Sequence, residues 1–343
     1  MKALLLSAYK QLDFVEIPAP VPGDDELLIR ICACGICGSD VHGYDGSTGR
    51  RLPPIVMGHE AAGVVEAVGS AVTNFRAGDR VTFDSTVSCG KCFYCLRGHI
   101  NLCDHREVVG VSTSAFRRMG AFAEFVTVPA RIAYPLPESM SFTHAALIEA
   151  VSVAVHAVSL TPIALDDTVV VVGAGMIGLL TMQAARLAGA GAIIVLDVDE
   201  TRLDLARSLG ATHTLNSRSV DLQARIMDLT SGRGADAALE CVGSTAPVKL
   251  ALDSVRKGGT VTLIGNVAPT IELGLQSAVT RQIRLQGSCA SSGEYPACIS
   301  MMARKAIRVE PLISAVAPLQ DGPAWFHRLY EREPGLLKVV LEP

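Results

Sequence analysis

The distribution of apolar residues divides the chain into two parts with different periods. Up to about residue 135, short alternating runs such as Glu26–Ile31 and Gly63–Gly69 are separated by Gly, Pro, Asn and Asp turns, which predicts short strands joined by loops. From about Ser141, alanine-rich helical stretches alternate with continuous apolar runs, a pattern typical of a parallel sheet buried between helices. The four runs are Thr168–Val172, Ala192–Leu196, Ala237–Cys241 and Thr260–Ile264.

The last part of the chain returns to a mixed pattern from about Tyr295. Within it, Gly335–Leu341 predicts a final strand that can rejoin the N-terminal part. A chain of 343 residues is too long for one ordinary hydrophobic core. The sequence therefore predicts an α/β protein of two domains, one β-rich and one with a doubly wound parallel sheet.

Composition and charge exclude several classes of partner. The net charge is −4, so no strong basic field attracts nucleic acid or an anionic membrane, and we expect neither partner. No apolar run reaches the roughly 18 to 20 residues that span a bilayer. Met1–Ser7 predicts a first strand and is too short for a secretory signal, so we expect a cytoplasmic protein.

Four of the ten cysteines are closely spaced, at Cys89, Cys92, Cys95 and Cys103. Four thiolates at this spacing can surround one metal ion, and such a soft sulfur set favours Zn²⁺, or less often an iron-sulfur centre. A site with four protein ligands has no open position for substrate. We therefore expect a structural metal here and look elsewhere for the chemistry.

A glycine-rich turn follows the first strand of the predicted parallel sheet. Gly173, Gly175 and Gly178 form a G-x-G-x-x-G motif that opens a helical stretch. The first glycine permits the tight turn, the second lets the backbone approach a pyrophosphate, and the third allows close helix packing. The motif, with Met176 and Ile177 inside it, predicts a dinucleotide site.

The next strand ends at Asp197, 19 residues beyond Gly178. A carboxylate there can bind the adenosine ribose hydroxyls and would repel a 2′-phosphate, which favours NAD over NADP. Arg202 leaves an alternative open, because a nearby arginine can receive such a phosphate or lie against the adenine.

Two fragments of the β-rich part pair metal-ligand residue types with glycines. They are Cys37–His42, which includes Ser39, and Gly58–Glu60, which includes His59. We place both in loops. Either fragment alone is weak evidence, because a buried structural cysteine near a satisfied histidine is the commoner arrangement.

The ordered set of motifs resembles the zinc-dependent medium-chain dehydrogenase/reductase superfamily, and within it the polyol branch that includes sorbitol dehydrogenase. The likeness runs nearly end to end. Besides the motifs above, it rests on the following segments: Gly63–Gly69, Gly78–Val81, Ala121–Phe125 and Ala146–His156. Glu149 in the last segment marks the branch, because alcohol dehydrogenases of the superfamily typically have a cysteine there.

The resemblance implies two zinc ions per subunit. The catalytic zinc would be held by Cys37, His59 and Glu60, with Glu149 as an alternate or water-bridged ligand, and the four-cysteine site would hold the structural zinc. It further implies a GroES-like catalytic domain of residues 1–150 and 296–343, a Rossmann NAD-binding domain of residues 151–295, and a homodimer or homotetramer.

The resemblance also assigns roles in catalysis and coenzyme binding. Ser39 would start a proton relay that reaches His42, while Glu149 could act instead through water. Three further segments resemble family stretches that border the nicotinamide, although ordinary loop packing explains them equally well. Their residues are Cys241, Val242, Ile264, Gly265, Asn266, Ser288, Cys289 and Ala290.

Four positions depart from the sorbitol-type pattern. Gly43 follows the relay histidine where an aromatic residue is usual, Ala290–Ser291 replaces an Arg-Tyr pair, and Ala150 replaces a proline. The expected substrate is therefore a polyol or related small alcohol, without commitment to sorbitol. Arginines in predicted loops could bind a phosphate or simply be solvated. They are Arg50, Arg51, Arg117 and Arg118.

Other readings remain open from the sequence. The same chemistry could act on a sugar phosphate, on an amino alcohol such as L-threonine, or on a simple secondary alcohol. A non-enzymatic alternative is an NAD-sensing protein with a zinc-ribbon binding module, against which the acidic net charge and the intact Cys37, His59 and Glu60 set both argue.

Overall fold

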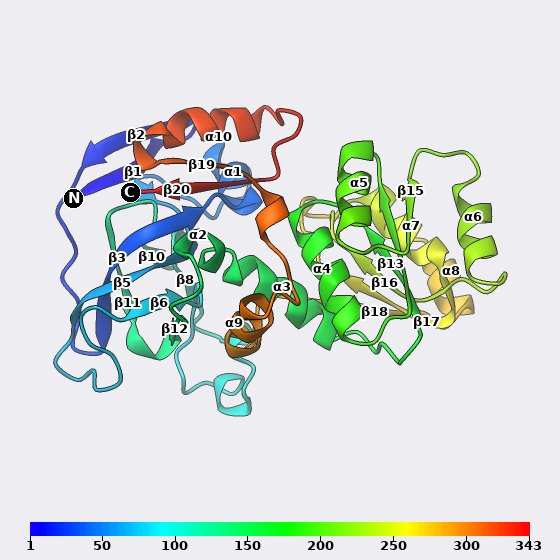
Figure 1. The fold of residues 1–343 in the computed structure, drawn as a ribbon, viewed down its shortest axis with the longest axis horizontal. Helices are drawn as coiled ribbons and strands as arrows, with labels where there is room; N and C mark the ends of the chain where they lie inside the picture. The colour runs from blue at the N-terminus through cyan, green and yellow to red at the C-terminus, as the bar shows by residue number, and fades with distance from the viewer. The chain divides into compact units, whose positions relative to one another are not determined.

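The computed structural model describes residues 1–343, which form two compact units. The first unit comprises Met1–Glu149, Tyr295–Ala303 and Val309–Pro343. The second unit comprises Ala150–Glu294 and Arg304–Arg308. In the colours of Figure 1, the blue, cyan and red elements belong to the first unit and most green and yellow elements to the second.

A seven-stranded sheet forms the centre of the first unit, in the order β12-β6-β5-β3-β20-β19 with β11 also paired to β3. β20 pairs antiparallel with the end of β3 through Val340 and Leu341, which confirms that the final strand rejoins the N-terminal part. The seven strands are β3 (Glu26–Gly35), β5 (Glu60–Val68), β6 (Arg80–Phe83), β11 (Phe125–Pro129), β12 (Ala133–Pro135), β19 (Ile313–Pro318) and β20 (Lys338–Glu342).

Smaller elements complete the first unit. The predicted first strand is present as β1 (Lys2–Ala8), which pairs with β2 and β4. The remaining strands are β2 (Gln11–Glu16), β4 (Ile55–Val56), β7 (Thr86–Val87), β8 (Glu107–Val108), β9 (Val111–Ser112) and β10 (Arg117–Arg118). The helices are α1 (Gly38–Tyr44), α2 (Phe142–Ala145), α3 (Ile148–Ser159, which continues into the second unit), α9 (Tyr295–Ala303) and α10 (Gly322–Tyr330).

The core of the first unit lies between the sheet and these elements. Phe83, Phe122 and Phe326 are fully buried there, together with Leu4 and Ile29. The rings of Phe122 and Phe326 meet edge to face at 5.5 Å, so α10 is anchored on the same core as the N-terminal strands.

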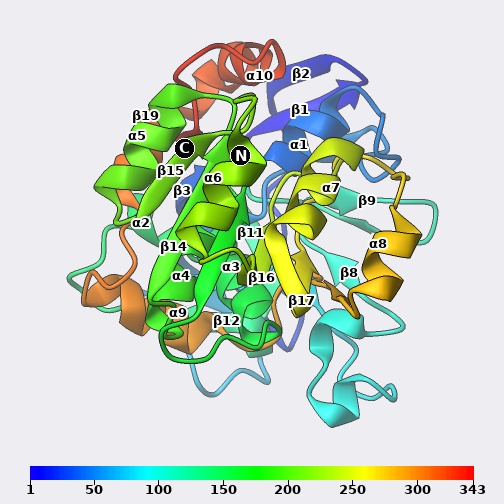
Figure 2. The same cartoon turned by 90° about the vertical axis from the view of Figure 1, so that its right-hand side faces the viewer.

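The second unit is a six-stranded parallel sheet in the order β15-β14-β13-β16-β17-β18 (Figure 2). The order reverses between β13 and β16, which makes this the switch point of a doubly wound sheet. The strands are β13 (Thr168–Val172), β14 (Ala192–Asp197), β15 (His213–Asn216), β16 (Ala235–Glu240), β17 (Val255–Leu263) and β18 (Arg284–Gly287). The helices are α4 (Met176–Leu187), α5 (Glu200–Ser208), α6 (Leu222–Leu229), α7 (Thr245–Ser254) and α8 (Leu275–Thr280).

The continuous apolar runs correspond to the four central strands. β16 ends one residue earlier than predicted, so Cys241 lies just beyond it, and β17 begins five residues earlier, at Val255. The two edge strands, β15 and β18, lack an apolar run because they are not buried on both sides.

One helical stretch, Phe142–Ser159, is long and apolar enough by length and composition to cross a membrane. This finding corrects the expectation that no segment reaches that length. However, 61% of the stretch is buried within the protein, as a core helix would be.

Candidate active site

Cys37 is the N-cap residue just before α1, so the rest of the fragment up to His42 is helical and not a loop as predicted. Its Sγ accepts a hydrogen bond from the backbone N–H of Ser39 at 3.5 Å, and the carboxylate of Asp40 accepts one from the backbone N–H of Cys37 at 3.4 Å. This reciprocal pair is a capping box, with cysteine in the place where serine or threonine is usual. The cap fixes the direction in which the thiol points.

His59 lies just before β5 and is 6% exposed. Its Nε2 is 3.4 Å from the hydroxyl of Ser39, and its Nδ1 is 3.4 Å from Oδ1 of Asp40. Burial disfavours the charged ring, but the nearby Asp40 and Cys37 outweigh it and raise the pKa of His59 well above its usual value. Gly58 has φ +93°, and a Cβ there would lie 2.8 Å from the backbone N of Phe122, so only glycine permits this approach.

Glu60 is the first residue of β5, and both of its oxygens accept hydrogen bonds from Lys338, at 2.8 and 2.6 Å. Lys338 is 3% exposed and also donates to the carbonyl of Ile36 at 2.9 Å. Sequence reasoning missed this lysine, because it lies 278 residues away in β20 and no motif marks it.

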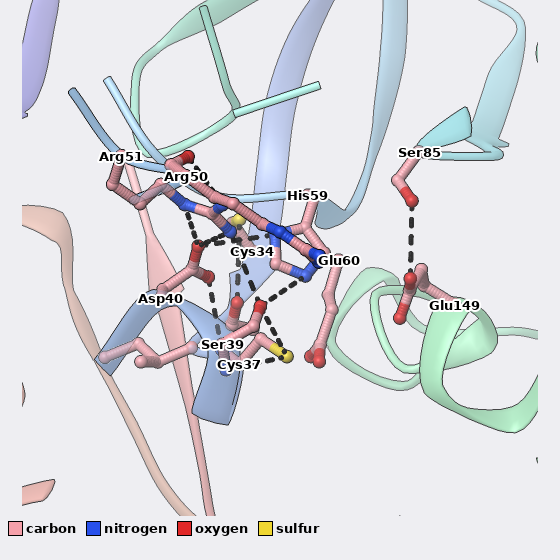
Figure 3. A network of polar contacts seen from close by, with 12 residues as sticks. Cys34, Cys37, Ser39, Asp40, Arg50, Arg51, His59, Glu60, Ser85 and Glu149 are labelled. Carbon is pink, nitrogen blue, oxygen red and sulfur yellow. Dashed lines mark hydrogen bonds and ion pairs between the residues drawn. The ribbon is translucent and has the colours of Figure 1, made fainter. Parts of the chain in front are cut away.

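The donor atoms of Cys37, His59 and Glu60 lie within 4.8 Å of one another (Figure 3). Tetrahedral zinc with bonds of about 2.0 to 2.3 Å separates its ligands by about 3.3 to 3.8 Å, so a small contraction would suffice. One thiol, one imidazole and one carboxylate are three zinc donors, and three donors leave a fourth position open. The residues present therefore fit a catalytic zinc.

Glu149 is not part of that three-residue cluster. It lies near the start of α3, apart from Cys37 and His59 in Figure 3, and Ser85 donates a hydrogen bond to its Oε1 at 3.3 Å. Burial raises the pKa of the Glu149 carboxyl to about 7; His59 opposes the shift, and Glu60 and Asp84 reinforce it.

Only one end of the expected proton relay is in contact with the metal-binding residues. The hydroxyl of Ser39 is 3.3 Å from Sγ of Cys37 and 3.4 Å from Nε2 of His59. His42 is exposed on α1 and makes no hydrogen bond through its ring. The structure therefore does not join Ser39 to His42 directly.

The four closely spaced cysteines also converge. The sulfur atoms of Cys89, Cys92, Cys95 and Cys103 lie within 4.8 Å of one another. Backbone N–H groups donate to Sγ of Cys103 from Cys89 at 3.2 Å and from His105 at 3.3 Å. Backbone N–H groups of Cys95 and Asp104 lower the pKa of the Cys92 thiol to about 6, which favours the thiolate that a metal requires.

The glycine-rich turn has the geometry that a pyrophosphate requires. Gly173 has φ +98°, and a Cβ at Gly178 would lie 1.8 Å from the carbonyl oxygen of Gly173, so the helix packs directly on the turn. A Cβ at Gly175 would meet nothing within 4 Å, so the backbone is open to a ligand there. Gly175 is the N-cap of α4, whose first N–H groups, at Met176 and Ile177, are free of intrahelical acceptors.

Asp197 ends β14 and is 8% exposed. Its carboxylate accepts from the backbone N–H of Ala174 at 2.6 Å, of Val198 at 2.7 Å and of Asp199 at 3.0 Å. It therefore fixes the glycine-rich turn. Arg202 lies 3.8 Å from Asp199 in an ion pair on α5.

The three other predicted coenzyme segments follow strands β16, β17 and β18 at the carboxyl edge of the sheet. A Cβ at Gly265 would lie 2.2 Å from the backbone C of Val242, so the first two segments meet backbone to backbone. Burial raises the pKa of the Cys241 thiol, which disfavours the reactive thiolate form. The segments are Cys241–Val242, Ile264–Asn266 and Ser288–Ala290.

The four arginines predicted in loops differ in what they contact, and two of them form β10 (Arg117–Arg118) instead. Arg51 is buried against Asp40, and Arg118 pairs with Glu26 at 2.9 Å and with Glu107 at 3.1 Å. Arg50 is exposed, and Arg117 is exposed and donates to Ser112 at 3.2 Å. Carboxylates thus already neutralise two of the four, which leaves Arg50 and Arg117 as arginines that could meet a phosphate.

Comparison with known proteins agrees with this geometry. Residues 23–138 match the alcohol dehydrogenase GroES-like domain, and residues 177–304 match the zinc-binding dehydrogenase domain. The chain is 34% identical to sorbitol dehydrogenase of Bacillus subtilis, over 100% of this chain and 97% of that protein. It is 34% identical to L-idonate 5-dehydrogenase of Vitis vinifera, over 91% and 86% respectively.

A solved structure resembles the fold closely. A zinc-binding dehydrogenase of Sinorhizobium meliloti 1021, bound to NADP, superposes with a TM-score of 0.90 at 32% identity, covering 100% of this chain and 99% of that one. The chain belongs to the zinc-dependent medium-chain dehydrogenase superfamily, in its polyol branch. It is an oxidoreductase that acts on CH–OH groups with zinc and a nicotinamide nucleotide.

Proposed function

We propose that this protein oxidises a secondary hydroxyl of a polyol or sugar alcohol to a ketone, with NAD as the hydride acceptor. The observation that carries the proposal is the three-donor cluster of Cys37, His59 and Glu60, with Glu149 as a nearby carboxyl of raised pKa. Relatives that act on sorbitol and idonate support the polyol class. Family membership and the glycine-rich turn support a nicotinamide nucleotide as the hydride acceptor.

We assign the catalytic zinc to Cys37 and His59, with Glu60 as third ligand and Glu149 as the alternate or water-bridged one. A second, structural zinc is assigned to the four-cysteine cluster, whose converging thiols support it. When bound, zinc would act as a Lewis acid that eases removal of the hydroxyl proton, and the nicotinamide would accept hydride.

The protein groups handle the proton. The Ser39 hydroxyl, 3.4 Å from Nε2 of His59, would start the relay beside the metal ligands, and exposed His42, which Ser39 does not contact, would release the proton to solvent. Glu149 offers a second route, because a carboxyl whose pKa is about 7 can hold or release a proton near neutral pH.

NAD is preferred over NADP for two reasons. Asp197 places a negative charge at the end of β14, which would repel a 2′-phosphate. Arg202 is engaged with Asp199, so it is less available to receive that phosphate. The relative crystallised with NADP keeps the alternative open to measurement.

We further propose a catalytic domain of residues 1–150 and 296–343 and a coenzyme domain of residues 151–295. A homodimer or homotetramer is supported by the open edge strand β18, beside which Leu275, Val279 and Leu285 are exposed. We also propose a cytoplasmic location, as expected from the sequence.

The test is a screen of NAD reduction over polyols, their phosphates, L-threonine and simple secondary alcohols, with NADP in parallel. Turnover should be highest with an unphosphorylated polyol and NAD. A preference for a sugar phosphate would shift the assignment toward the exposed Arg50 and Arg117. Binding of NAD without reduction on any alcohol would refute the enzymatic proposal in favour of a sensor.

A further inference from the structure

Gly43 is explained by the side chain that lies against it. It sits on α1, and a Cβ there would lie 2.2 Å from Cγ and 3.1 Å from Cβ of Arg51. Its φ is not in the left-handed region, so space rather than backbone conformation requires glycine. The aliphatic stem of Arg51 therefore occupies the volume that a side chain at position 43 would take.

The head of Arg51 is buried in a dense set of polar contacts. Its Nε and Nη2 donate to Oδ1 of Asp40 at 3.3 and 2.9 Å, and its Nη1 donates to the carbonyl of Arg50 at 3.1 Å. Nη2 also lies 3.4 Å from the hydroxyl of Ser39. Arg51 is 4% exposed and Asp40 is fully buried, so solvent does not share these bonds.

Asp40 transmits this contact to the metal ligands. The oxygen that binds Arg51 also faces Nδ1 of His59 at 3.4 Å, an ion-pair contact at which this buried nitrogen makes no hydrogen bond, and the other oxygen accepts from the backbone N–H of Cys37 at 3.4 Å (Figure 3). A carboxylate on the far nitrogen of a metal-binding histidine fixes the ring orientation. Arg51 in turn fixes the carboxylate.

We propose that Arg51 is a positioning residue of the catalytic zinc site, acting through Asp40 on His59 and Cys37, and that Gly43 is the residue that makes room for it. This inference rests on the proposed function, because it requires zinc at Cys37. Arg51 makes no hydrogen bond to Cys37, His59 or Glu60, so its effect is on how rigidly these donors are oriented.

Two effects of Arg51 on zinc affinity have opposite signs. Its positive charge repels a dication, but Asp40 neutralises that charge at 2.9 Å, so the repulsion is small. Its fork fixes the carboxylate that orients His59, and loss of such an outer partner typically costs about 10- to 100-fold in metal affinity. Positioning therefore outweighs repulsion, and removal of Arg51 weakens zinc binding.

The experiment measures metal binding directly. Metal-free wild type and Arg51→Met are titrated with Co²⁺ and Zn²⁺ against a competing chelator, and Cys37→Ser identifies which binding step belongs to the catalytic site. We expect Arg51→Met to bind about 10- to 100-fold more weakly at that step, with binding at the four-cysteine site unchanged. The matched control Arg50→Met removes an exposed arginine next in sequence and should bind as wild type does.

Gly43→Ala is the second variant. It keeps every charge and polar group but places a methyl where the Arg51 stem lies, so it should weaken the same step in the same direction. It also keeps the test decisive if Arg51→Met does not fold. Arg51→Lys keeps the charge without the fork and should recover only part of the affinity.

The inference is overturned if folded Arg51→Met binds metal at the Cys37 step as tightly as wild type or more tightly. If Arg51→Met does not fold, the same result in Gly43→Ala overturns it. In either case Arg51 would affect zinc binding only through its charge and not by orienting the donors. Failure of the proposed function is a different result: wild type itself would then show no binding step that Cys37→Ser removes.

Discussion

Lys338→Met removes the ammonium group that binds both oxygens of Glu60. The pair is almost fully buried, at 3% and 2% side-chain exposure, and the two donor–acceptor distances are 2.8 and 2.6 Å. Methionine fills a similar volume but leaves the Glu60 carboxylate without its partner and the carbonyl of Ile36 without a donor. The substitution therefore isolates the electrostatic role of Lys338 from its packing.

The expected cost follows from the burial of the pair. Removing one partner of a buried ion pair destabilises a protein by about 3 to 5 kcal/mol, because the remaining charge is left uncompensated. In a domain of 150 to 250 residues, each kcal/mol shifts Tm by about 2 to 4 °C, which gives a fall of about 6 to 20 °C. Lys2→Met is the matched control, because Lys2 pairs with Glu16 at 3.2 Å with exposures of 50% and 74% and should cost about 1 kcal/mol or less.

The assay is calorimetry of the full-length protein, with and without zinc, which follows the thermal unfolding of the first unit. Zinc held at Cys37 and His59 would supply a positive charge to Glu60, so the variant should lose more stability in the metal-free protein than in the zinc-loaded one. The double variant Lys338→Met with Glu60→Gln removes both charges and should recover most of the lost stability. A fall no larger than that of Lys2→Met, or a double variant as unstable as the single one, would refute the reasoning.

Three further predictions follow from the same structure. Cys37→Ser should lower the zinc content by one ion per chain and abolish turnover, with the fold retained. Cys95→Ser should lose the other ion and lower Tm. Metal analysis and calorimetry test both outcomes. Asp197→Ser should raise the ratio of kcat/KM with NADP to kcat/KM with NAD by at least about tenfold. Because it frees the N–H of Ala174, it should also weaken the binding of both coenzymes. An unchanged ratio would contradict the role of Asp197. For Glu149, the pKa of about 7 in the folded protein lies above the usual value of 4.5. As the pH rises, the unfolded chain therefore releases this proton before the folded protein does. The stability of the metal-free protein should consequently fall by up to about 3 kcal/mol between pH 4.5 and 7. Glu149→Gln should flatten that fall in pH-dependent calorimetry, and equal slopes would rule out the carboxyl.

The sequence was most informative where a local pattern determines the structure. Continuous apolar runs predicted the four central strands of the parallel sheet, because a strand buried on both faces must be apolar throughout. The glycine-rich turn was predictable for a similar reason: Gly173 and Gly178 occupy positions where a side chain does not fit. Edge strands β15 and β18 carry no such constraint and left no comparable signal.

Long-range partners could not be read from the sequence. Lys338 meets Glu60 only because β20 pairs with β3, and a register shift of one residue would point the lysine to the other face. The helix after Cys37 was missed because cysteine is an unusual N-cap, although Asp40 at the third helical position was a usable sign. Gly43 was recognised as a departure, but its cause, the stem of Arg51, required coordinates.

The two candidate acidic residues near His59, Glu60 and Glu149, have different surroundings. Glu60 is ion-paired with the Lys338 ammonium at 2.6 Å, whereas burial and like charges favour the protonated form of Glu149. A carboxylate that is already ion-paired is a poor proton carrier, and a carboxyl titrating near neutral pH is a poor permanent ligand. This separation favours Glu60 as the fixed negative charge beside the zinc donors and Glu149 as the group that moves protons. Lys338, although distant in sequence, would therefore determine that Glu60 is the fixed charge and Glu149 the proton carrier.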